Sequence, residues 1–543
     1  MPVSHRGEIA IIKNARSSVL RTLPWCVAVL GAVALTTGAR ADGSHDNGEG
    51  PDAHNMRWVG HADLQGRPAY EPTVIQQGNR FILYVAHHES TLLNPLTGKL
   101  EPDGVSIVDV TDPRHPRQLF HLPGIEGNDS SMVRVCPGPN TQPGLAPGLP
   151  HGQPGHFYML RAFGQLAHEI WDTTDPSHPS LVSTVVTGLN RTHKNWWECN
   201  TGIAYLVADK RSEGWHTGQH LKIFDLSNPA SPVYIRDFGL LGQNPQTKVP
   251  QTPYTAATVH GPISVPEKNR VYLPNGVGSN GSIQIIDRAK LLDVSGLAPS
   301  ERLNPTDAEM LIPQVSIINM SPDQGGHTSF PVYGIPQPKY AEFKNDNPRD
   351  VLVVTSEATS NFCQEAPHFG FLMDITDDAH PWPLSTLRVN DEDGNPPFCE
   401  RGPRFGTHAS NENFYPPYYG KLTFISYFDA GVRVWDIRDP VHPKQVAHFI
   451  PPVNANVVPS CATLNGVQTC RTDISTNNVE LDTRNFIYIV DRIGGGADIL
   501  ELTGEAKEIG EGKNEPDRDD HRGDDKDNGN DRHDNDDPHT RGR

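Results

Sequence analysis

The 543-residue sequence predicts an all-β fold, a seven-bladed β-propeller closed by an N-terminal strand that completes the last blade. Two observations support this fold class. A strand-and-turn motif recurs at intervals of about 45 to 90 residues, a spacing typical of propellers with variable loops. The chain also contains 49 glycines and 49 prolines and few stretches with helical periodicity, so strands and turns must form most of it.

The clearest copy of the motif is GVRVWDIRDPVHP at residues 431–443. Its β-branched residues around Trp435 predict a buried strand, and Asp439-Pro440 predicts a tight turn. The other copies are GVSIVDVTDPRHP from Gly104, AHEIWDTTDPSHP from Ala167, LKIFDLSNPASP from Leu221 and, more loosely, GSIQIIDRAK from Gly281 and GFLMDITDDAHP from Gly370. We expect the strand aspartates of these copies to cap backbone amides in the turn.

Each copy belongs to a longer unit of four predicted strands, the content of one propeller blade. The third unit starts at His193, continues with GIAYLVAD and LKIFD, and ends with VYIRDF. Seven such units follow one another. The seventh lacks an outer strand, and MRWVGHADLQG from Met56 lacks an inner partner. We therefore expect the two ends of the propeller to meet in the last blade.

The two ends of the chain differ from the repeats in composition. Residues 1–41 predict a signal peptide, because a basic segment precedes an apolar run and Ala39-Arg40-Ala41 forms a cleavage site. We expect residues 42–55 to be a flexible mature N-terminus, residues 56–504 to form the propeller, and residues 505–543 to be a disordered charged tail. The mature chain should have no transmembrane segment and should be exported, either to the periplasm or out of the cell.

Six of the seven cysteines lie outside the predicted signal peptide. An even number in an exported chain favours disulfides, and free buried cysteines are the alternative for each pair. The expected pairs are Cys461 with Cys470, Cys363 with Cys399, and Cys136 with Cys199. The first would close a short loop, and the second would join loops on one face of the same blade.

The repeat, with its I-V-D core followed by a D-P-x-x-P turn, resembles the LVIVD-repeat proteins, a family of exported bacterial β-propellers. The resemblance covers about residues 56–502 and is strongest in the first, third and sixth units. It implies the fold and export. The family has no defined activity, so the resemblance implies no catalytic residues.

One rim of the propeller should collect the polar residues that flank the inner strands. The innermost strand of a blade begins, and the second strand ends, on the same face of the disc because the two are antiparallel. The candidate metal ligands at the strand starts are His193, His260, His327 and His408. The candidate ligand-binding residues are Trp196 and Trp197 beside His193, and Asp209, Glu357, Asp429 and Asp491 at the strand ends.

These residues support two classes of function. The first is an exported scaffold that binds a protein, a glycan or a small ligand through rim loops at the channel mouth. The alternative is a metal-dependent enzyme, an oxidoreductase or hydrolase, because imidazole and carboxylate ligands suit a transition-metal cofactor. We favour the scaffold, because a histidine repeated at one position often hydrogen-bonds to the next blade, and no H-E-x-x-H or C-x-x-C motif occurs. The formal net charge of -19 argues against a nucleic-acid partner.

Overall fold

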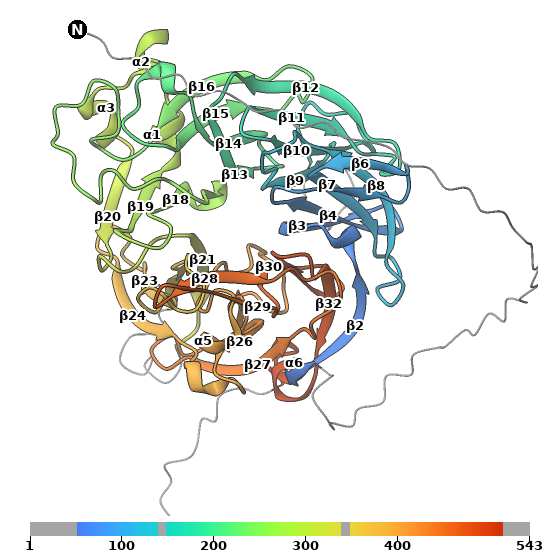
Figure 1. The fold of residues 1–543 in the computed structure, drawn as a ribbon. Helices are drawn as coiled ribbons and strands as arrows, with labels where there is room; N and C mark the ends of the chain where they lie inside the picture. The colour runs from blue at the N-terminus through green and yellow to red at the C-terminus, as the bar shows by residue number, and fades with distance from the viewer. Residues whose placement is uncertain (1–50, 140–147, 338–347, 514–543) are drawn as a thin grey trace, which may run out of the picture. The chain divides into compact units, whose positions relative to one another are not determined.

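The computed structural model describes residues 51–139, 148–337 and 348–513. In these residues, seven four-stranded sheets surround a central channel as the blades of a β-propeller (Figure 1). The predicted fold class and blade number are therefore confirmed. The predicted signal peptide at residues 1–41 lies outside the described residues. Within the described ranges, no helix is both long enough and apolar enough to cross a membrane.

In each of the first three blades the strands follow one another in chain order from the channel outward, and blade one also carries an inserted hairpin. Blade one contains β3 (Ala69–Gln77), β4 (Arg80–His87), β7 (Gly104–Asp109) and β8 (Arg117–Pro123), and the inserted hairpin is β5 (Thr91–Asn94) with β6 (Lys99–Pro102). Blade two contains β9 (Val133–Pro137), β10 (Phe157–Phe163), β11 (Ala167–Asp172) and β12 (Ser180–Thr187). Blade three contains β13 (Arg191–Trp197), β14 (Ile203–Asp209), β15 (His220–Asp225) and β16 (Val233–Phe238).

Blades four and five follow the same order, and short helices fill their connections. Blade four contains β17 (Ile263–Val265), β18 (Arg270–Asn275), β19 (Ser282–Asp287) and β20 (Gln314–Asn319). Between β19 and β20 lie α1 (Arg288–Leu292), α2 (Pro299–Leu303) and α3 (Asp307–Leu311). Blade five contains β21 (Thr328–Ile335), β22 (Arg349–Thr355), β23 (Gly370–Asp374) and β24 (Trp382–Leu387), and α5 (Phe398–Arg401) follows it. The short 3-10 turns are η1 (Leu64–Gly66), η2 (Arg211–Glu213), η3 (Pro266–Lys268) and η4 (Asp391–Asp393).

Two N-terminal strands complete the last two blades. Blade seven combines β30 (Thr476–Leu481), β31 (Ile487–Asp491) and β32 (Ala497–Leu502) with β2 (Met56–Ala62) as its outer strand, which confirms the predicted closure. Blade six combines β25 (Leu422–Ser426), β26 (Val432–Asp436) and β27 (Lys444–Ile450) with β1 (Asp52–His54). Strand β1 falls in the segment that we expected to be flexible. The backbone of β1 pairs with the open edge of β27, and this pairing explains why the segment forms a strand although its sequence has no apolar pattern.

The charged tail starts later than the composition predicts. Helix α6 (Gly504–Gly510) occupies the beginning of the segment expected to be disordered. Its Ala506 and Ile509 lie three residues apart on one helical face, and both are buried against the core shared by blades six and seven. Two apolar residues in a charged stretch were enough to dock one short helix. Residues 514–543 lie outside the described residues.

The repeated turn is built as its sequence predicts. The amide of Thr111 donates to Asp109 Oδ1 over 3.0 Å, so the strand aspartate caps the chain as it leaves the third strand. The same contact joins Thr174 to Asp172 (2.9 Å), Ser227 to Asp225 (2.8 Å), Thr376 to Asp374 (2.8 Å) and Arg438 to Asp436 (3.0 Å). These aspartates therefore belong to the scaffold.

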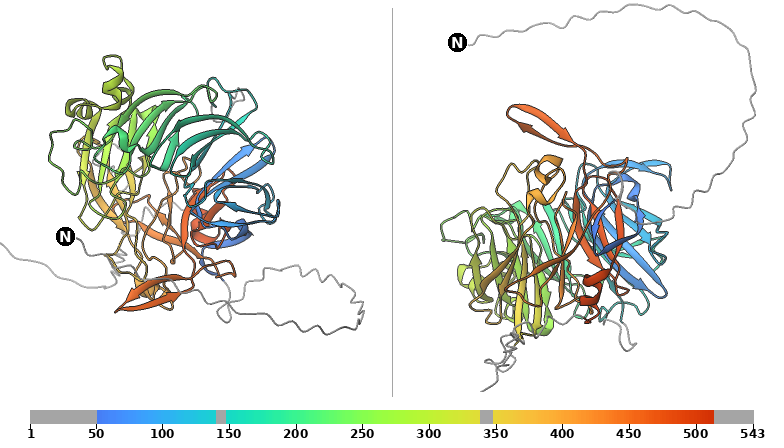
Figure 2. Two further views of the ribbon diagram at one scale, coloured as in Figure 1. Left: turned by 45° about the horizontal axis from the view of Figure 1, so that its top comes forward. Right: turned by 90° about the horizontal axis from the view of Figure 1, so that it is seen from below.

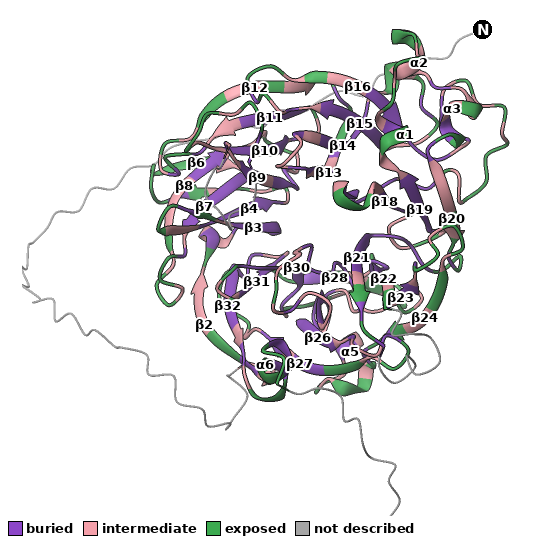
Figure 3. Cartoon of the chain, turned by 180° about the vertical axis from the view of Figure 1, so that it is seen from behind, coloured by how far each residue is buried: buried purple, intermediate pink, exposed green. Residues whose placement is uncertain are grey.

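The core lies between neighbouring blades. Between blades one and two, for example, Tyr84 and Ile107 pack against Val133 and Met159, all fully buried. Figure 3 shows buried residues along the inner strands and exposed ones on the outer strands and short helices. Each blade thus depends on its neighbours, and closure of the ring protects the last sheet edges.

All three expected disulfides are present. Cys136–Cys199 joins blades two and three, Cys363–Cys399 links the connection between β22 and β23 to helix α5, and Cys461–Cys470 crosses a two-stranded hairpin, with Cα–Cα distances of 5.3, 5.3 and 4.1 Å. The hairpin consists of β28 (Ser460–Leu464) and β29 (Val467–Arg471) and projects from one face of the ring (Figure 2).

Candidate metal centre

The four strand-start histidines lie together in the central channel. His193 belongs to β13, and His260 and His327 lie just before β17 and β21. His408 begins a short segment that pairs with β25 of blade six. Their rings form a row with centroid separations of 4.4 Å (His193 to His260), 3.8 Å (His260 to His327) and 4.1 Å (His327 to His408). The last three rings are buried. The structure therefore brings the four histidines together, and their role as metal ligands stays a prediction.

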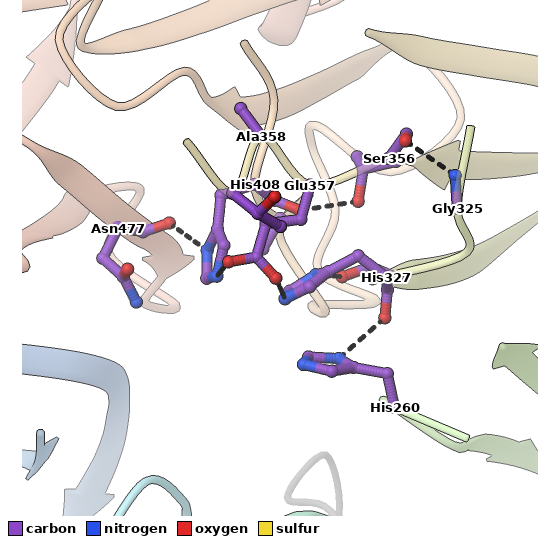
Figure 4. Close-up of polar contacts among 12 residues, drawn as sticks. His260, Gly325, His327, Ser356, Glu357, Ala358, His408 and Asn477 are labelled. Carbon is purple, nitrogen blue, oxygen red and sulfur yellow. Dashed lines mark hydrogen bonds and ion pairs between the residues drawn. The ribbon is translucent and has the colours of Figure 1, made fainter. Parts of the chain in front are cut away.

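Hydrogen bonds to the backbone fix which ring nitrogen of two histidines carries the proton. His260 Nδ1 lies 3.0 Å from the carbonyl oxygen of His327, and His408 Nδ1 lies 2.6 Å from that of Asn477 (Figure 4). A carbonyl oxygen can only accept, so Nδ1 must donate in both rings. In a neutral imidazole this leaves Nε2 with a bare lone pair, the form that binds a metal ion.

The imidazoles are held in that neutral form. Burial, with the nearby charge of Lys194, lowers the pKa of His193 to about 3. Burial also places the pKa values of His260, His327 and His408 well below the usual value for histidine. None of the four rings competes for a metal ion by taking up a proton near neutral pH.

Glu357 faces two of these rings at distances that no hydrogen bond explains. Its carboxylate oxygens lie 3.7 Å from His327 Nε2 and 3.8 Å from His408 Nε2 (Figure 4), and both nitrogens are buried without a hydrogen-bond partner. Two ligands that each lie about 2.0–2.2 Å from one ion have roughly this spacing. Ligand atoms of His260, His327 and Glu357 also all lie within 4.8 Å of one another. The arrangement fits a mononuclear transition-metal site.

His193 and Tyr70 complete the row at its other end. His193 Nε2 lies 2.6 Å from His260 Nε2, and the Tyr70 hydroxyl lies 3.1 Å from the first and 3.4 Å from the second. Burial and the charge of Glu357 raise the pKa of Tyr70, so its hydroxyl stays protonated. The 2.6 Å contact is a direct hydrogen bond between the rings. A metal ion on His260 would compete with His193 for the same lone pair.

Further polar residues lie beside the row, and we call this group of residues the channel chamber. Its members are Tyr70, His88, Asp129, Glu357, Arg404 and Arg492. The Tyr70 and His88 rings are 4.9 Å apart, and His88 Nδ1 lies 3.6 Å from Asp129 Oδ1. Arg404 Nη1 donates to Glu357 Oε1 over 2.7 Å. The chamber thus combines both signs of charge with neutral imidazoles.

Two other groups among the described residues have metal-like spacing, but a lysine already occupies each. Glu71, Glu412 and Glu480 surround the ammonium of Lys194, which lies 2.8 Å from Glu412 and 3.4 Å from Glu71. Likewise, Lys222 Nζ lies 2.5 Å from Glu213 and 2.8 Å from Asp237 in the group that includes His220. The histidine row is the group without such an ammonium in the described part of the chain.

The structure places both tryptophans of the sequence prediction in blade packing. Trp197 is buried in the core between blades two and three and donates to the Gly202 carbonyl over 3.3 Å. The Arg134 guanidinium carbon lies 4.8 Å from the centroid of the Trp196 ring, and Trp196 packs against two core clusters. Their size favoured this outcome, because aromatic rings fill the wide gaps between twisted sheets.

Of the four predicted acids, only Glu357 contacts the histidine row. Asp491 accepts backbone hydrogen bonds from residues 475, 493 and 495 and so shapes a loop. Asp209 lines a separate pocket of about 570 Å³ with Arg191 and Trp215. Asp429 is fully buried with both oxygens unpartnered, and burial next to Asp473 raises its pKa well above the usual value. These three acids therefore lie apart from the histidine row, and their role in ligand binding stays a prediction.

Sequence reasoning missed Tyr70, Arg404, Arg492 and Asn477. Tyr70 is the second residue of the inner strand of blade one, so the strand-start position could have identified it. Asn477 holds the same place in β30, the inner strand of blade seven. The two arginines lie in irregular loops that carry no periodic signal.

Comparison with known proteins adds a fold likeness alone. No family model and no curated protein matches the chain. Raptor from Chaetomium thermophilum is 12% identical with a TM-score of 0.47, and the match covers 83% of this chain and 30% of that one. Sqt1 from the same organism, solved bound to the N-terminus of ribosomal protein L10, is 12% identical with a TM-score of 0.42 and coverages of 82% and 99%. A protein from Lactobacillus plantarum is 11% identical with a TM-score of 0.41, and the match covers 78% of this chain and 87% of that one. Such similarities say nothing about the activity of this chain.

Proposed function

We propose that the protein is a metal-dependent enzyme with a mononuclear centre held by His260, His327, His408 and Glu357. The observation that carries this proposal is the pair of buried, unpartnered Nε2 atoms that face the Glu357 carboxylate at 3.7 and 3.8 Å. A buried polar atom without a partner costs about 1–3 kcal/mol. One ion shared by both rings and the carboxylate would satisfy all of these groups.

The donor set favours iron, copper, zinc or nickel. Imidazole and carboxylate suit these ions, and all six cysteines of the described ranges are in disulfides and unable to ligate. A hydrolase would also need a general base beside the metal-bound water. In the proposed centre Glu357 binds the ion and accepts a hydrogen bond from Arg404, so its carboxylate does not serve as that base. We therefore place the reaction among oxidoreductases that use iron or copper.

We propose that this enzyme works outside the cytoplasm. Its three disulfides are compatible with export, because such bonds persist in oxidising compartments. The basic and apolar N-terminal segment supports the same location.

The scaffold function keeps one observation in its favour. The β28–β29 hairpin projects from the ring, and its Val467 is 65% exposed (Figure 2). A disulfide between Cys461 and Cys470 stiffens it. A rigid, exposed hairpin with an apolar tip is suited to contact another protein. Such a contact would leave the channel and its metal centre accessible.

Metal analysis of the purified mature protein tests the proposed function. The protein is made without a polyhistidine tag, stripped with a chelator, reloaded with each of the four metals in turn and analysed by mass spectrometry. We expect near-stoichiometric uptake of iron or copper, and its loss in the double variant H260Q/H408Q. The matched control is H178Q/H442Q, whose imidazoles are 81% and 67% exposed in turns of the outer surface.

Folding of both variants is checked by circular dichroism and thermal unfolding. If H260Q/H408Q does not fold, calorimetric titration of the stripped wild-type protein decides. A wild-type protein that takes up none of the four metals refutes the proposal. So does a double variant that folds and still binds metal with wild-type stoichiometry.

A further inference from the structure

Two arginines reach the channel chamber from different blades. Arg404 lies between α5 and β25, and Arg492 lies between β31 and β32. Arg404 Nη1 donates to Glu357 Oε1 over 2.7 Å and to the Ala358 carbonyl over 3.2 Å. Arg492 Nη1 donates over 3.0 Å to the side chain of Asn477, the residue whose carbonyl holds His408. Arg404 thus contacts a candidate metal ligand directly, and Arg492 is linked to another, His408, through Asn477.

Arg492 has no anionic partner of its own. In the described ranges no carboxylate forms an ion pair with its guanidinium, whose one hydrogen bond goes to a neutral amide. Burial and the neighbouring charge of Arg404 lower its pKa to about 10, so it remains protonated at neutral pH. Glu357 and Asp129 act on this charge from a distance without forming an ion pair with it, so an incoming anion can bind the guanidinium directly.

Metal binding would increase the positive charge of the chamber. Without an ion, Arg404 and Arg492 are balanced by Glu357 and Asp129. Burial alone would raise the pKa of Asp129, but the nearby His88 imidazole and a hydrogen bond from the Glu89 amide lower it to about 2, so it is charged. Because the imidazoles are neutral, a divalent ion adds two uncompensated positive charges. In a region of low dielectric this strongly favours an anionic ligand beside the ion.

We propose that the substrate of this metal centre carries a carboxylate group that binds to Arg492 and to the unused edge of the Arg404 guanidinium. This inference rests on the proposed function. A guanidinium presents paired N–H donors that match a carboxylate. Arg404 uses only Nη1 for its two hydrogen bonds, so its other nitrogens can face the chamber. The carboxylate would thereby place the rest of the substrate next to the ion and the Tyr70 hydroxyl.

Anion binding to the Co²⁺-loaded protein tests this inference. Cobalt replaces the native ion, and its visible spectrum reports a ligand near the metal. The protein is titrated with acetate, and with acetamide as the neutral analogue, in chloride-free buffer. We expect saturable binding of acetate and none of acetamide. R492Q should raise the Kd for acetate at least tenfold while its cobalt content stays at the wild-type level. The matched control is R57Q, because Arg57 lies on the outer strand β2 with 64% of its side chain exposed.

The outcomes separate this inference from the proposed function. A wild-type protein that takes up neither cobalt nor any of the four metals named above refutes both. If it takes up copper but not cobalt, the acetate titration is made on the copper-loaded protein. Normal cobalt uptake with equal affinity for acetate and acetamide refutes the carboxylate site alone. The same holds if R492Q binds cobalt and acetate like the wild-type protein, because acetate would then bind to the metal without the arginine. If R492Q does not fold, R492K takes its place: it retains the charge but loses the paired donors, and we expect an intermediate Kd.

Discussion

Replacing Cys136 and Cys199 together by alanine should destabilise the whole propeller. Their disulfide joins blades two and three across a sequence separation of 63 residues, and Cys136 is fully buried in the core between those blades. For a loop of this length the chain-entropy estimate of the lost stability is about 4 kcal/mol. Because each blade packs on its neighbours, the loss should appear in global unfolding. We expect a thermal midpoint lower by several degrees in calorimetry under non-reducing conditions.

The control for this prediction is the double alanine variant of Cys461 and Cys470. Their bond closes a separation of nine residues, for which the same estimate gives about 2.5 kcal/mol. The hairpin is an exposed appendage of the ring, so its opening should leave the main transition unchanged and increase only local proteolysis of residues 460–471. Equal shifts in the two variants, or an unshifted midpoint after loss of Cys136–Cys199, would refute the reasoning.

Two further predictions concern the closing strand β2. At Gly60 an added Cβ would lie 2.0 Å from a backbone carbonyl oxygen, so G60A should lower the free energy of unfolding in urea by about 1–3 kcal/mol. The control is G296A, whose added Cβ meets no atom within 4 Å and should leave the stability unchanged. Equal urea midpoints for the two variants would contradict this prediction. Burial alone would lower the pKa of His61, but its 2.8 Å contact with Asp498 outweighs burial and raises it. The stability from this contact is complete below pH 6.5 and is lost as pH rises through the raised pKa. In urea unfolding, the free energy of unfolding of the wild-type protein should therefore fall more steeply above pH 6.5 than that of H61N, with a difference of less than about 1 kcal/mol. Parallel pH curves for the two proteins would show that the contact is not pH-linked.

The sequence was most informative where one physical requirement repeats. Every blade needs an apolar strand such as GVRVWD and a capped turn after it, so spacing and turn chemistry were enough to count the blades and to predict how the ring closes. Strand β1 and helix α6 escaped prediction for the opposite reason. Each is only a few residues long and is stabilised by contact with the folded propeller rather than by its own sequence. A local sequence pattern therefore does not indicate it.

Site residues were predictable to the extent that the backbone fixes their direction. The histidines at the strand starts converge because each belongs to the innermost strand region, whose side chains must face the channel. The acids at the strand ends lie where loops of different length begin. Glu357 therefore turns inward, while Asp491 turns back to cap its own loop. Loop geometry also decides the positions of Arg404 and Arg492, so no repeat pattern could have identified them.

The structural and the metal-binding interpretations of the histidines are compatible. We expected a repeated histidine to tie one blade to the next, and two of them have this contact: His260 of blade four donates to residue 327 at the start of blade five, and His408 of blade six donates to residue 477 of blade seven. Each of these bonds uses Nδ1. A neutral imidazole carries one N–H proton, and the bond between blades requires this proton on Nδ1. Nε2 is therefore unprotonated, and its lone pair faces the channel. The scaffold contact therefore prepares the ligand, and a substitution that kept the interblade bond but lacked Nε2, such as H408N, would separate the two roles.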